Sequence, residues 1–296
     1  FQAEDGIRDS VASRGRGDVY KRQPDSGMSV ATEENVPMET REGTILKADI
    51  YRPSRPGRFP VLLCRTPYDK SKDTYIEVAT KLASRGYIVA TQDIRGRYAS
   101  DGEFFWQFQN NSETYDTEDG YDAVNWAASL PGSDGQVGTW GHSYASWCIW
   151  RLAASNPSPL KAIFASGMGA NLLRLNFGVF ETGRRLQWTY QNAADARRRA
   201  GDLVGPYTSE EAEKRWYEVE RGKWLWYLPL DDIPDYVFST MSPMLKKYLR
   251  EQDKEFWAFR EIHNQVNAPT CVLTGWWDRL VDTISNFEGM VENGPK

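Results

Sequence analysis

Apolar and polar positions alternate along the first half of the chain in short segments with strand or helix spacing. Residues 43–51 alternate as a half-buried strand does, and residues 59–64 form a short apolar run. Residues 74–85 place apolar side chains at helical spacing before Gly86, and residues 87–91 form the next apolar run. This succession of strand, helix and strand predicts a βαβ unit with a right-handed crossover.

The same alternation continues further along the chain. It predicts a helix over 116–130, a strand over 137–140, a helix over 144–154 and a strand over 160–165. Regular alternation of strands and helices is typical of the α/β class. We therefore expect a mostly parallel sheet with helices on both faces.

The pattern changes in the second half of the chain. Residues 184–222 are rich in Arg, Glu, Gln and Trp with helical but no strand spacing, and we expect a helical cap insertion over about 171–265. Strand character returns at 270–274, and an amphipathic helix follows over 280–290. We expect the core to consist of residues 38–170 and 266–296, on either side of the cap.

The beginning of the chain shows no such periodicity. Residues 1–23 start at Phe, lack the apolar run of a signal peptide, and resemble translated sequencing-adapter readthrough. We expect residues 1–37 to be a non-native or disordered leader, with the core pattern starting near Met38. Because the native start is not visible, the compartment is open, with the cytoplasm as the default expectation.

Composition narrows the class of protein. The 296 residues are 40% apolar and include 12 Trp, 15 Tyr and 12 Phe, which suffices for a large core and excludes a disordered chain. The net charge of −5 offers no basic surface, so we expect no nucleic-acid or anionic-lipid partner. No apolar stretch reaches the roughly 18 to 20 residues that cross a bilayer, so we expect no membrane span. Self-association into a homo-oligomer is left open.

The three cysteines are far apart and each lies in an apolar run. Cys64, Cys148 and Cys271 form no C-x-x-C pair, and we expect buried thiols.

Residues 141–145 carry the strongest chemical signal. They read Gly-His-Ser-Tyr-Ala between a predicted strand and a predicted helix, which is typical of a nucleophile elbow. In that turn the hydroxyl of Ser143 is exposed, and the N–H of Tyr144 at the helix start can stabilise an oxyanion. Ala145 stands where the pattern prefers Gly and should crowd the turn slightly. The competing interpretation is an ordinary serine in a turn.

A triad acid and base are harder to find. Asp278 follows a later predicted strand, where the acid belongs in the order nucleophile, acid, histidine, although an Asp there commonly caps a turn. Asp282 competes but falls within the next helix. We interpret His142 as a packing residue that points away from the serine, and expect a surface or interdomain role for His263. Neither is a good general base.

No metal or cofactor motif is present in the sequence. It contains no H-E-x-x-H motif, cysteine cluster, phosphate-binding loop or dinucleotide fingerprint. We expect no metal and no organic cofactor.

Four sequence motifs, taken in their order along the chain, indicate a particular protein family. They are Arg-Thr-Pro-Tyr-Asp-Lys at 65–70, the segment 92–104 around Asp-Ile-Arg-Gly, the elbow, and Gly-Trp-Trp-Asp at 275–278. Over about residues 38–294 the chain resembles the cocaine esterase/X-Pro dipeptidyl-peptidase family of serine hydrolases. The resemblance implies a catalytic α/β-hydrolase domain with a helical cap. Family members continue with a final strand, a loop holding the catalytic histidine, and a jelly-roll domain, which this sequence does not include.

The resemblance also implies roles for single residues. Ser143 is the expected nucleophile and Asp278 the triad acid, while the phenol of Tyr68 and the amide of Tyr144 form the oxyanion hole. Taken alone, Tyr68 would be a turn residue. We expect the carboxylate and guanidinium of the Asp-Ile-Arg-Gly segment, Asp93 and Arg95, to pair and hold their loop.

Several residues are candidates for contact with the substrate. Leu280 matches an apolar family position near the acyl pocket, and Trp277 and Phe105 are candidates because they lie beside the motifs. Asp231 and Asp232 of the cap could bind an amino group, as acidic clusters do in the α-amino-acid ester hydrolases of this family, although a solvated charged loop is the commoner explanation. Two further aromatics, Trp147 and Trp150, are expected to pack under the elbow helix.

These expectations lead to one functional hypothesis with two rivals. The first is a serine hydrolase that cleaves esters or amides of small acyl or aminoacyl groups through an acyl-enzyme on Ser143, with a small ester or short peptide as partner. The second is an X-Pro dipeptidyl peptidase or an α-amino-acid ester or β-lactam acylase. The third is a non-catalytic binding protein with a hydrolase fold. For lack of a histidine base, we expect residues 1–296 alone to be nearly inactive.

Overall fold

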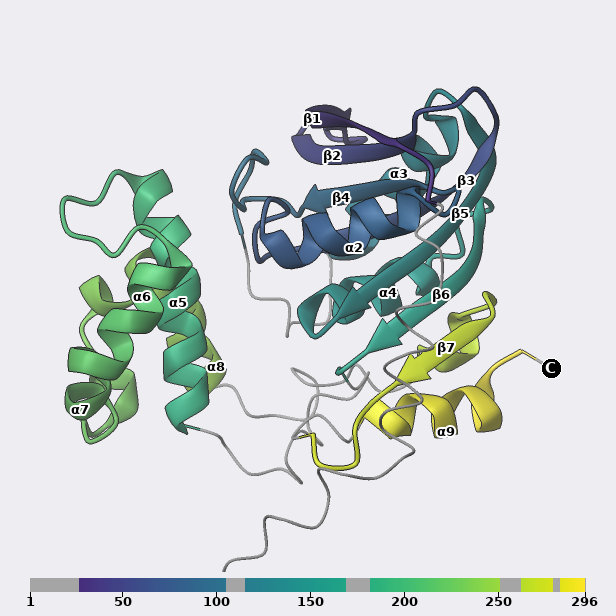
Figure 1. The fold of residues 1–296 in the computed structure, drawn as a ribbon. Coiled ribbons are helices and arrows are strands. Elements are labelled where there is room, and N and C mark those ends of the chain that lie inside the picture. The colour runs from purple at the N-terminus through teal and green to yellow at the C-terminus, as the bar shows by residue number, and fades with distance from the viewer. Residues whose placement is uncertain (1–26, 105–114, 169–181, 251–261, 279–282, 296) are drawn as a thin grey trace, which may run out of the picture.

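The computed structural model describes residues 27–104, 115–168, 182–250, 262–278 and 283–295. Within these residues one seven-stranded sheet has the strand order β1-β2-β4-β3-β5-β6-β7 (Figure 1). The strands are β1 (Val30–Glu39), β2 (Ile45–Pro53), β3 (Phe59–Thr66), β4 (Ile88–Asp93), β5 (Ser133–His142), β6 (Leu160–Ser166) and β7 (Thr270–Leu273). Strand β2 pairs antiparallel with β1 and β4, and every other pair is parallel. The predicted α/β class with a mostly parallel sheet is confirmed.

Eight α-helices are described alongside this sheet. They are α2 (Asp73–Ala83), α3 (Asp116–Ser129), α4 (Tyr144–Ala154), α5 (Thr182–Ala200), α6 (Ser209–Arg215), α7 (Arg221–Trp224), α8 (Ser242–Arg250) and α9 (Ile284–Asn293). None of them combines the length and the apolar character that a membrane span requires.

Side-chain alternation along β4 explains why helices cover both faces of the sheet. Ile88 and Ala90 belong to the main buried cluster, together with residues of α3 and α4. Val89 points to the other face, where it joins a smaller cluster with Ala79 and Ala83 of α2. Because β4 is buried along its whole length, each face needs its own helical cover.

The expected leader boundary is wrong at its C-terminal end. Residues 30–37 belong to β1, which pairs antiparallel with β2, so the fold starts before Met38. Most side chains of β1 before Met38 are exposed, because the strand lies at one edge of the sheet. A strand with so little burial carries no clear alternation, and the sequence pattern therefore misses it.

The opposite edge of the described sheet is β7. Cys64 and Cys148 are buried as expected, but the expectation for Cys271 is wrong, because this edge strand leaves its thiol exposed. Leu273 of the same strand is 55% exposed, and Trp277 just after it is 100% exposed. An apolar surface therefore runs along the end of β7.

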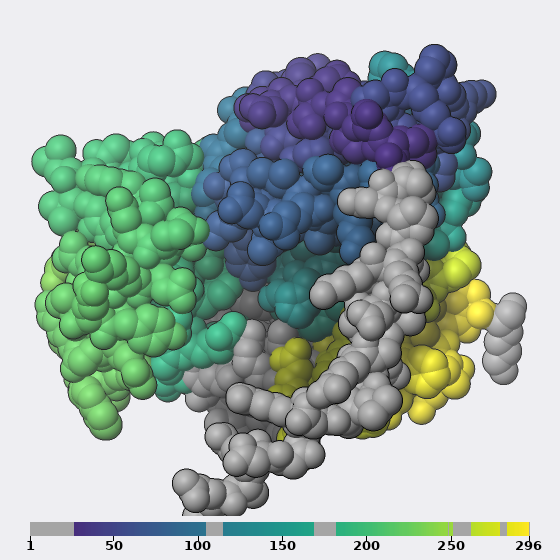
Figure 2. Space-filling model, in the orientation of Figure 1, coloured from purple at the N-terminus to yellow at the C-terminus, as the bar shows by residue number. Residues whose placement is uncertain are grey.

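The helices from α5 to α8 form the cap, which packs beside the core (Figures 1 and 2). The described residues 182–250 are helices and turns without a strand, as the sequence predicts. Thr208 starts α6 with a capping box, in which its hydroxyl accepts from the N–H of Glu211 while the Glu211 carboxylate accepts from the Thr208 N–H. The long helix α5 contacts the core through Trp188 and Asn192.

Candidate active site

Ser143 lies in the sharp turn between β5 and α4. Its backbone has φ 57° and ψ −124°, a conformation that is strained for a residue with a side chain. The Ser143 N–H donates to the Ser166 carbonyl at 2.9 Å, and the Ser143 carbonyl accepts from the Trp147 N–H at 3.1 Å. A nucleophile elbow holds its serine in this way, on a strained strand-to-helix turn.

Small residues on either side make this turn possible. A Cβ atom added at Gly141 would lie 2.8 Å from the Cβ of Ala145, closer than such atoms approach in proteins. The methyl group of Ala145 is therefore accommodated because residue 141 is glycine. A side chain at position 141 would meet Ala145, and the glycine that is present avoids this contact.

Tyr144 provides the first amide of α4. An N–H in the first turn has no carbonyl acceptor within its own helix, and the helix N-terminus carries partial positive charge. The amide is thus suited to an anion that forms beside Ser143. Burial raises the pKa of the Tyr144 hydroxyl well above its usual range, and the nearby Asp116 carboxyl adds to this shift.

Tyr68 approaches Ser143 from the loop after β3. Its hydroxyl oxygen lies 3.4 Å from Ser143 Oγ. The Tyr68 N–H donates to Thr66 Oγ1 at 3.0 Å, which fixes the start of the loop. Burial raises the pKa of Tyr68, while its hydrogen bonds with Ser143 and Trp188 lower it in part. The phenol is therefore held in the protonated form, which can donate a hydrogen bond.

A residue that the sequence analysis missed completes this cluster. The indole Nε1–H of Trp188, on α5, donates to the Tyr68 hydroxyl oxygen at 3.1 Å. The Trp188 ring stacks on Tyr144 with centroids 6.2 Å apart and an interplanar angle of 7°. Because 120 residues separate Trp188 from Tyr68, no local pattern could have revealed the contact.

Arg97 forms hydrogen bonds with both the Tyr68 loop and the cap. Its guanidinium is buried, and its Nε–H donates to the Pro67 carbonyl at 3.0 Å. Its Nη1–H donates to the Asn192 carbonyl of α5 at 3.0 Å and lies 3.7 Å from the Asp195 carboxylate. The loop and the cap helix are therefore braced by the same side chain.

The expected pair of Asp93 and Arg95 is wrong. Arg95 reaches the first turn of α3, where it donates to both carboxylate oxygens of Asp119 at 2.7 and 2.9 Å. Asp93 is buried at the end of β4 and accepts from the Lys70 N–H at 2.9 Å and the Ala99 N–H at 3.3 Å. Both residues hold loops, but different ones, because their side chains leave the strand end toward different neighbours. Burial raises the pKa of Asp93 to about 7.

Asp278 follows β7, and Ser143 follows β5, so both come after the carboxyl ends of parallel strands. Strand β6 separates their two strands in the sheet. Trp277 is fully exposed, and a side chain in that position lines no enclosed pocket. Three other expected positions lie outside the described residues, namely Phe105, Leu280 and Asp282.

Both histidines are engaged in other contacts. His142 is exposed and its Nδ1 lies 3.2 Å from Ser166 Oγ, so its expected packing role is wrong: the end of β5 carries it to the surface. His263 is only 8% exposed, so a surface role is wrong, whereas its contacts with two core helices from the end of the predicted insertion agree with the interdomain alternative. Its ring packs edge-on against Trp150 of α4, and its Nε2 lies 3.2 Å from Asn286 Oδ1 of α9.

The two acidic residues of the cap lie in a short turn at the surface. Arg250 Nε donates to Asp231 Oδ2 at 2.9 Å, and this hydrogen bond lowers the pKa of Asp231. Asp232 is exposed. The ion pair favours the interpretation of a charged surface loop over that of an amino-group site. The two aromatics of the elbow helix, Trp147 and Trp150, are buried under it as predicted.

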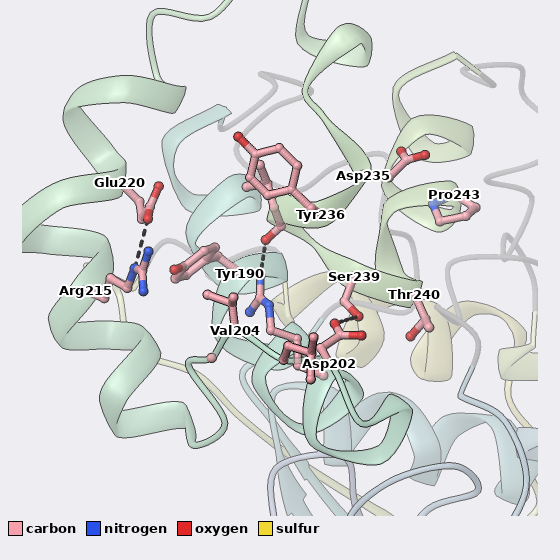
Figure 3. A pocket seen from close by; sticks show the side chains of 14 residues that line it. Tyr190, Asp202, Val204, Arg215, Glu220, Asp235, Tyr236, Ser239, Thr240 and Pro243 are labelled. Atoms are coloured by element: carbon pink, nitrogen blue, oxygen red, sulfur yellow. Dashed lines mark hydrogen bonds and ion pairs between the residues drawn. The ribbon is translucent and has the colours of Figure 1, made fainter.

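The cap also contains a cavity of about 850 Å³, shown in Figure 3. Its walls include Tyr190 and Tyr236, and an ion pair between Arg215 and Glu220 lies at one side. All residues that line it belong to the cap, so it is separate from the surroundings of Ser143. Among the described residues, no group of His, Cys, Asp and Glu side chains is arranged to hold a metal ion.

Solved structures share this architecture. An aminopeptidase from a marine sediment Thaumarchaeota archaeon matches the whole chain with a TM-score of 0.62 and 18% identity, over 50% of its own length. An α-amino acid ester hydrolase matches 98% of the chain with a TM-score of 0.62 and 17% identity, over 49% of its length. A CocE/NonD family hydrolase from Staphylococcus aureus matches 90% of the chain with a TM-score of 0.60 and 21% identity, over 44% of its length. These likenesses establish the α/β-hydrolase fold.

Sequence comparison identifies the family. Cocaine esterase from Rhodococcus sp. (strain MB1 Bresler) is 38% identical over 154 residues, which are 51% of this chain and 25% of that protein. The matches cover between a quarter and a half of the length of these four proteins. The family model of the X-Pro dipeptidyl-peptidase (S15 family) matches residues 42–295. The chain therefore belongs to the X-Pro dipeptidyl-peptidase S15 family of hydrolases, with cocaine esterase as a relative.

Proposed function

We propose that this protein is a serine hydrolase that cleaves esters or amides of small acyl or aminoacyl groups through an acyl-enzyme on Ser143. One observation carries the proposal: the hydroxyl of Tyr68 lies 3.4 Å from Ser143 Oγ, beside the strained turn at the start of α4. A nucleophile next to two hydrogen-bond donors, the phenol of Tyr68 and the amide of Tyr144, matches the requirements of acyl transfer.

The proposed reaction uses these groups in sequence. Ser143 Oγ attacks the substrate carbonyl carbon and its proton passes to a general base. The carbonyl oxygen becomes an oxyanion that accepts hydrogen bonds from the Tyr68 hydroxyl and the Tyr144 N–H. The intermediate expels the alcohol or amine, which takes up the proton, and leaves an ester on Ser143. Water then hydrolyses that ester and releases the acid.

We propose that neither of the two histidines of the chain is the general base of this scheme. His142 bonds to Ser166, and His263 is buried against α4 and α9. We therefore propose that an imidazole from outside residues 1–296 takes the proton, with Asp278 as the acid that orients it. On this proposal residues 1–296 alone hydrolyse esters very slowly.

A fluorophosphonate probe tests the proposed nucleophile in the full-length protein. The serine oxygen displaces fluoride from the probe only when its hydroxyl is activated. We expect labelling and p-nitrophenyl ester turnover in the wild type, and loss of both in Ser143→Ala. The control is Ser155→Ala, at the far end of α4, which should keep both. Absence of labelling in the wild type would instead support the non-catalytic binding protein.

An aminoacyl substrate is the second candidate, because the family model carries the name of a dipeptidyl peptidase. A panel of matched esters with free and acetylated amino groups distinguishes it from a simple acyl ester. Preference for the free amine that is lost in Asp232→Asn would assign the amino-group site to the cap turn. Equal turnover of both ester types would exclude that role for Asp231 and Asp232.

A further inference from the structure

The hydrogen bond between Trp188 and Tyr68 has a fixed direction. An indole nitrogen can only donate, so the Tyr68 oxygen must accept the bond that spans 3.1 Å. The phenol has a single hydrogen of its own, and that hydrogen cannot point at Trp188. The other polar atom within reach of the phenol oxygen in the described residues is Ser143 Oγ, at 3.4 Å.

We propose that Trp188 is a positioning residue for the oxyanion hole: by donating to the Tyr68 oxygen, it directs the phenol hydrogen toward the carbonyl oxygen of a substrate bound at Ser143. The inference rests on the proposed function. Trp188 acts through Tyr68, and the cap thereby contributes to the chemistry of the core.

The donated bond also strengthens the phenol as a donor. An oxygen that accepts one hydrogen bond becomes polarised, and its own hydrogen then makes a stronger bond to the next acceptor. The effect grows as water is excluded, and Tyr68 is partly buried against the main apolar cluster. Orientation and polarisation both favour the transition state, in which the oxygen charge is greatest.

Three aromatic rings keep this bond in place. Tyr68 meets Trp188 edge-on, with ring centroids 6.3 Å apart and an interplanar angle of 83°. It meets Tyr144 in the same way at 6.2 Å and 78°, while Trp188 and Tyr144 stack. The Trp188 carbonyl accepts from Asn192 Nδ2 at 2.9 Å, and the Asn192 carbonyl is itself bonded to Arg97. Helix α5 is thus fixed against the loop that carries Tyr68.

A double-mutant cycle on the full-length protein tests the inference with a p-nitrophenyl ester. Trp188→Phe keeps an aromatic ring but removes the N–H, and should lower kcat about tenfold with KM within about twofold of the wild type. In a Tyr68→Phe background the same change should cost no further activity, since the hydroxyl that it orients is gone. An unchanged kcat in Trp188→Phe, or an equal loss in both backgrounds, would overturn the inference.

A matched control removes another indole bond from the cap. Trp224 Nε1 donates to Glu220 Oε2 at 2.6 Å, within the cap and away from Tyr68. Trp224→Phe should therefore leave kcat within about twofold of the wild type while losing one comparable hydrogen bond. A tenfold loss of kcat in this control would attribute the Trp188 effect to general loosening of the cap and overturn the inference.

A second measurement needs no activity and can be made on residues 1–296. In a ¹⁵N correlation spectrum, the indole signal that disappears in Trp188→Phe identifies the Trp188 N–H. Tyr68→Phe should shift that signal and speed its exchange with water, and an unchanged signal would overturn the inference. Failure of the proposed function would appear separately, as ester turnover that survives in Ser143→Ala.

Discussion

At the scale of single residues, the buried carboxyl of Asp116 governs a pH effect on stability. It begins α3, and burial raises its pKa to about 7, partly opposed by the charge of Arg65. In the unfolded chain its pKa is near 3.8, so between about pH 4 and 7 the folded state holds a proton that the unfolded state has lost. The free energy of unfolding therefore falls as the pH rises through this window.

Replacing that carboxyl should remove its share of the pH dependence. Between pH 4 and 7, Asp116→Asn should lose less stability than the wild type, by up to about 1.4 kcal/mol per pH unit. Urea unfolding at pH 4.5, 5.5, 6.5 and 7.5 measures the difference. The control is Glu77→Gln, an exposed position on α2, which should follow the wild type. Parallel curves for Asp116→Asn and the wild type would contradict the prediction.

Single residues were predictable from sequence where their chemistry is local. The elbow around Ser143 combines a strand, small residues and a helix within a few positions, and the structure has that turn. Tyr68 was identified only through the family resemblance. No sequence pattern indicated the contact of Trp188 with Tyr68. The predicted partner of Arg95 was wrong, since Arg95 pairs with Asp119. Tertiary packing rather than sequence spacing decides which polar side chains meet.

At the scale of elements, the contact between α3 and α4 depends on one glycine. A Cβ atom added at Gly120 would lie 2.5 Å from Leu152 Cβ and 3.3 Å from Leu152 Cα. Gly120→Ala should therefore force the two helices apart and lower the free energy of unfolding by about 2 kcal/mol, measured in urea. Because α4 carries Tyr144 at its start, the same variant should also slow ester turnover.

A second helical glycine supplies the matched control. Gly222, in α7, would place a new Cβ in open space. Gly222→Ala should raise the free energy of unfolding by about 0.5 to 1 kcal/mol, because alanine favours the helix more than glycine does. If both variants changed stability alike, helix propensity and not the α3–α4 contact would be responsible.

Elements were predictable where one or both of their faces are buried. The predicted helix over 144–154 coincides with α4, and the predicted strands over 59–64 and 160–165 match β3 and β6 within two residues. Strand β1 was missed because only Met38 of its ten residues is buried. Hydrophobic periodicity records burial, so an exposed edge strand leaves little trace in it.

At the scale of the whole molecule, the cap and the core share one buried cluster. Leu186, Trp216 and Phe238 of the cap belong to the same apolar cluster as Val137 and Trp147 of the core. Contact between two parts over a common core favours unfolding in a single cooperative step. The position of Trp188 over Tyr68 is one local consequence of this shared packing.

An ion pair connects the cap to the core in addition to the apolar contacts. Arg97 of the core and Asp195 of the cap have side chains that are each 1% exposed, with 3.7 Å between Nη1 and Oδ2. The Asp195 carboxylate also accepts from the Tyr98 N–H at 3.0 Å and from Arg198 Nη2 at 2.6 Å. A buried guanidinium left without its carboxylate is strongly destabilising, since neither water nor another anion replaces it.

The ion pair between Arg250 and Asp231 inside the cap is an exposed counterpart of this buried one. Asp195→Asn should lower the free energy of unfolding by about 3 kcal/mol, because it leaves Arg97 buried with less compensation. Asp231→Asn removes the pairing with Arg250 at the surface, where water screens both charges, and should change stability far less. Calorimetry and urea unfolding measure both. Equal losses in the free energy of unfolding would mean that the pair of Arg97 and Asp195 does not hold the cap on the core. A separate unfolding transition of the cap that appears only in Asp195→Asn would show that it does.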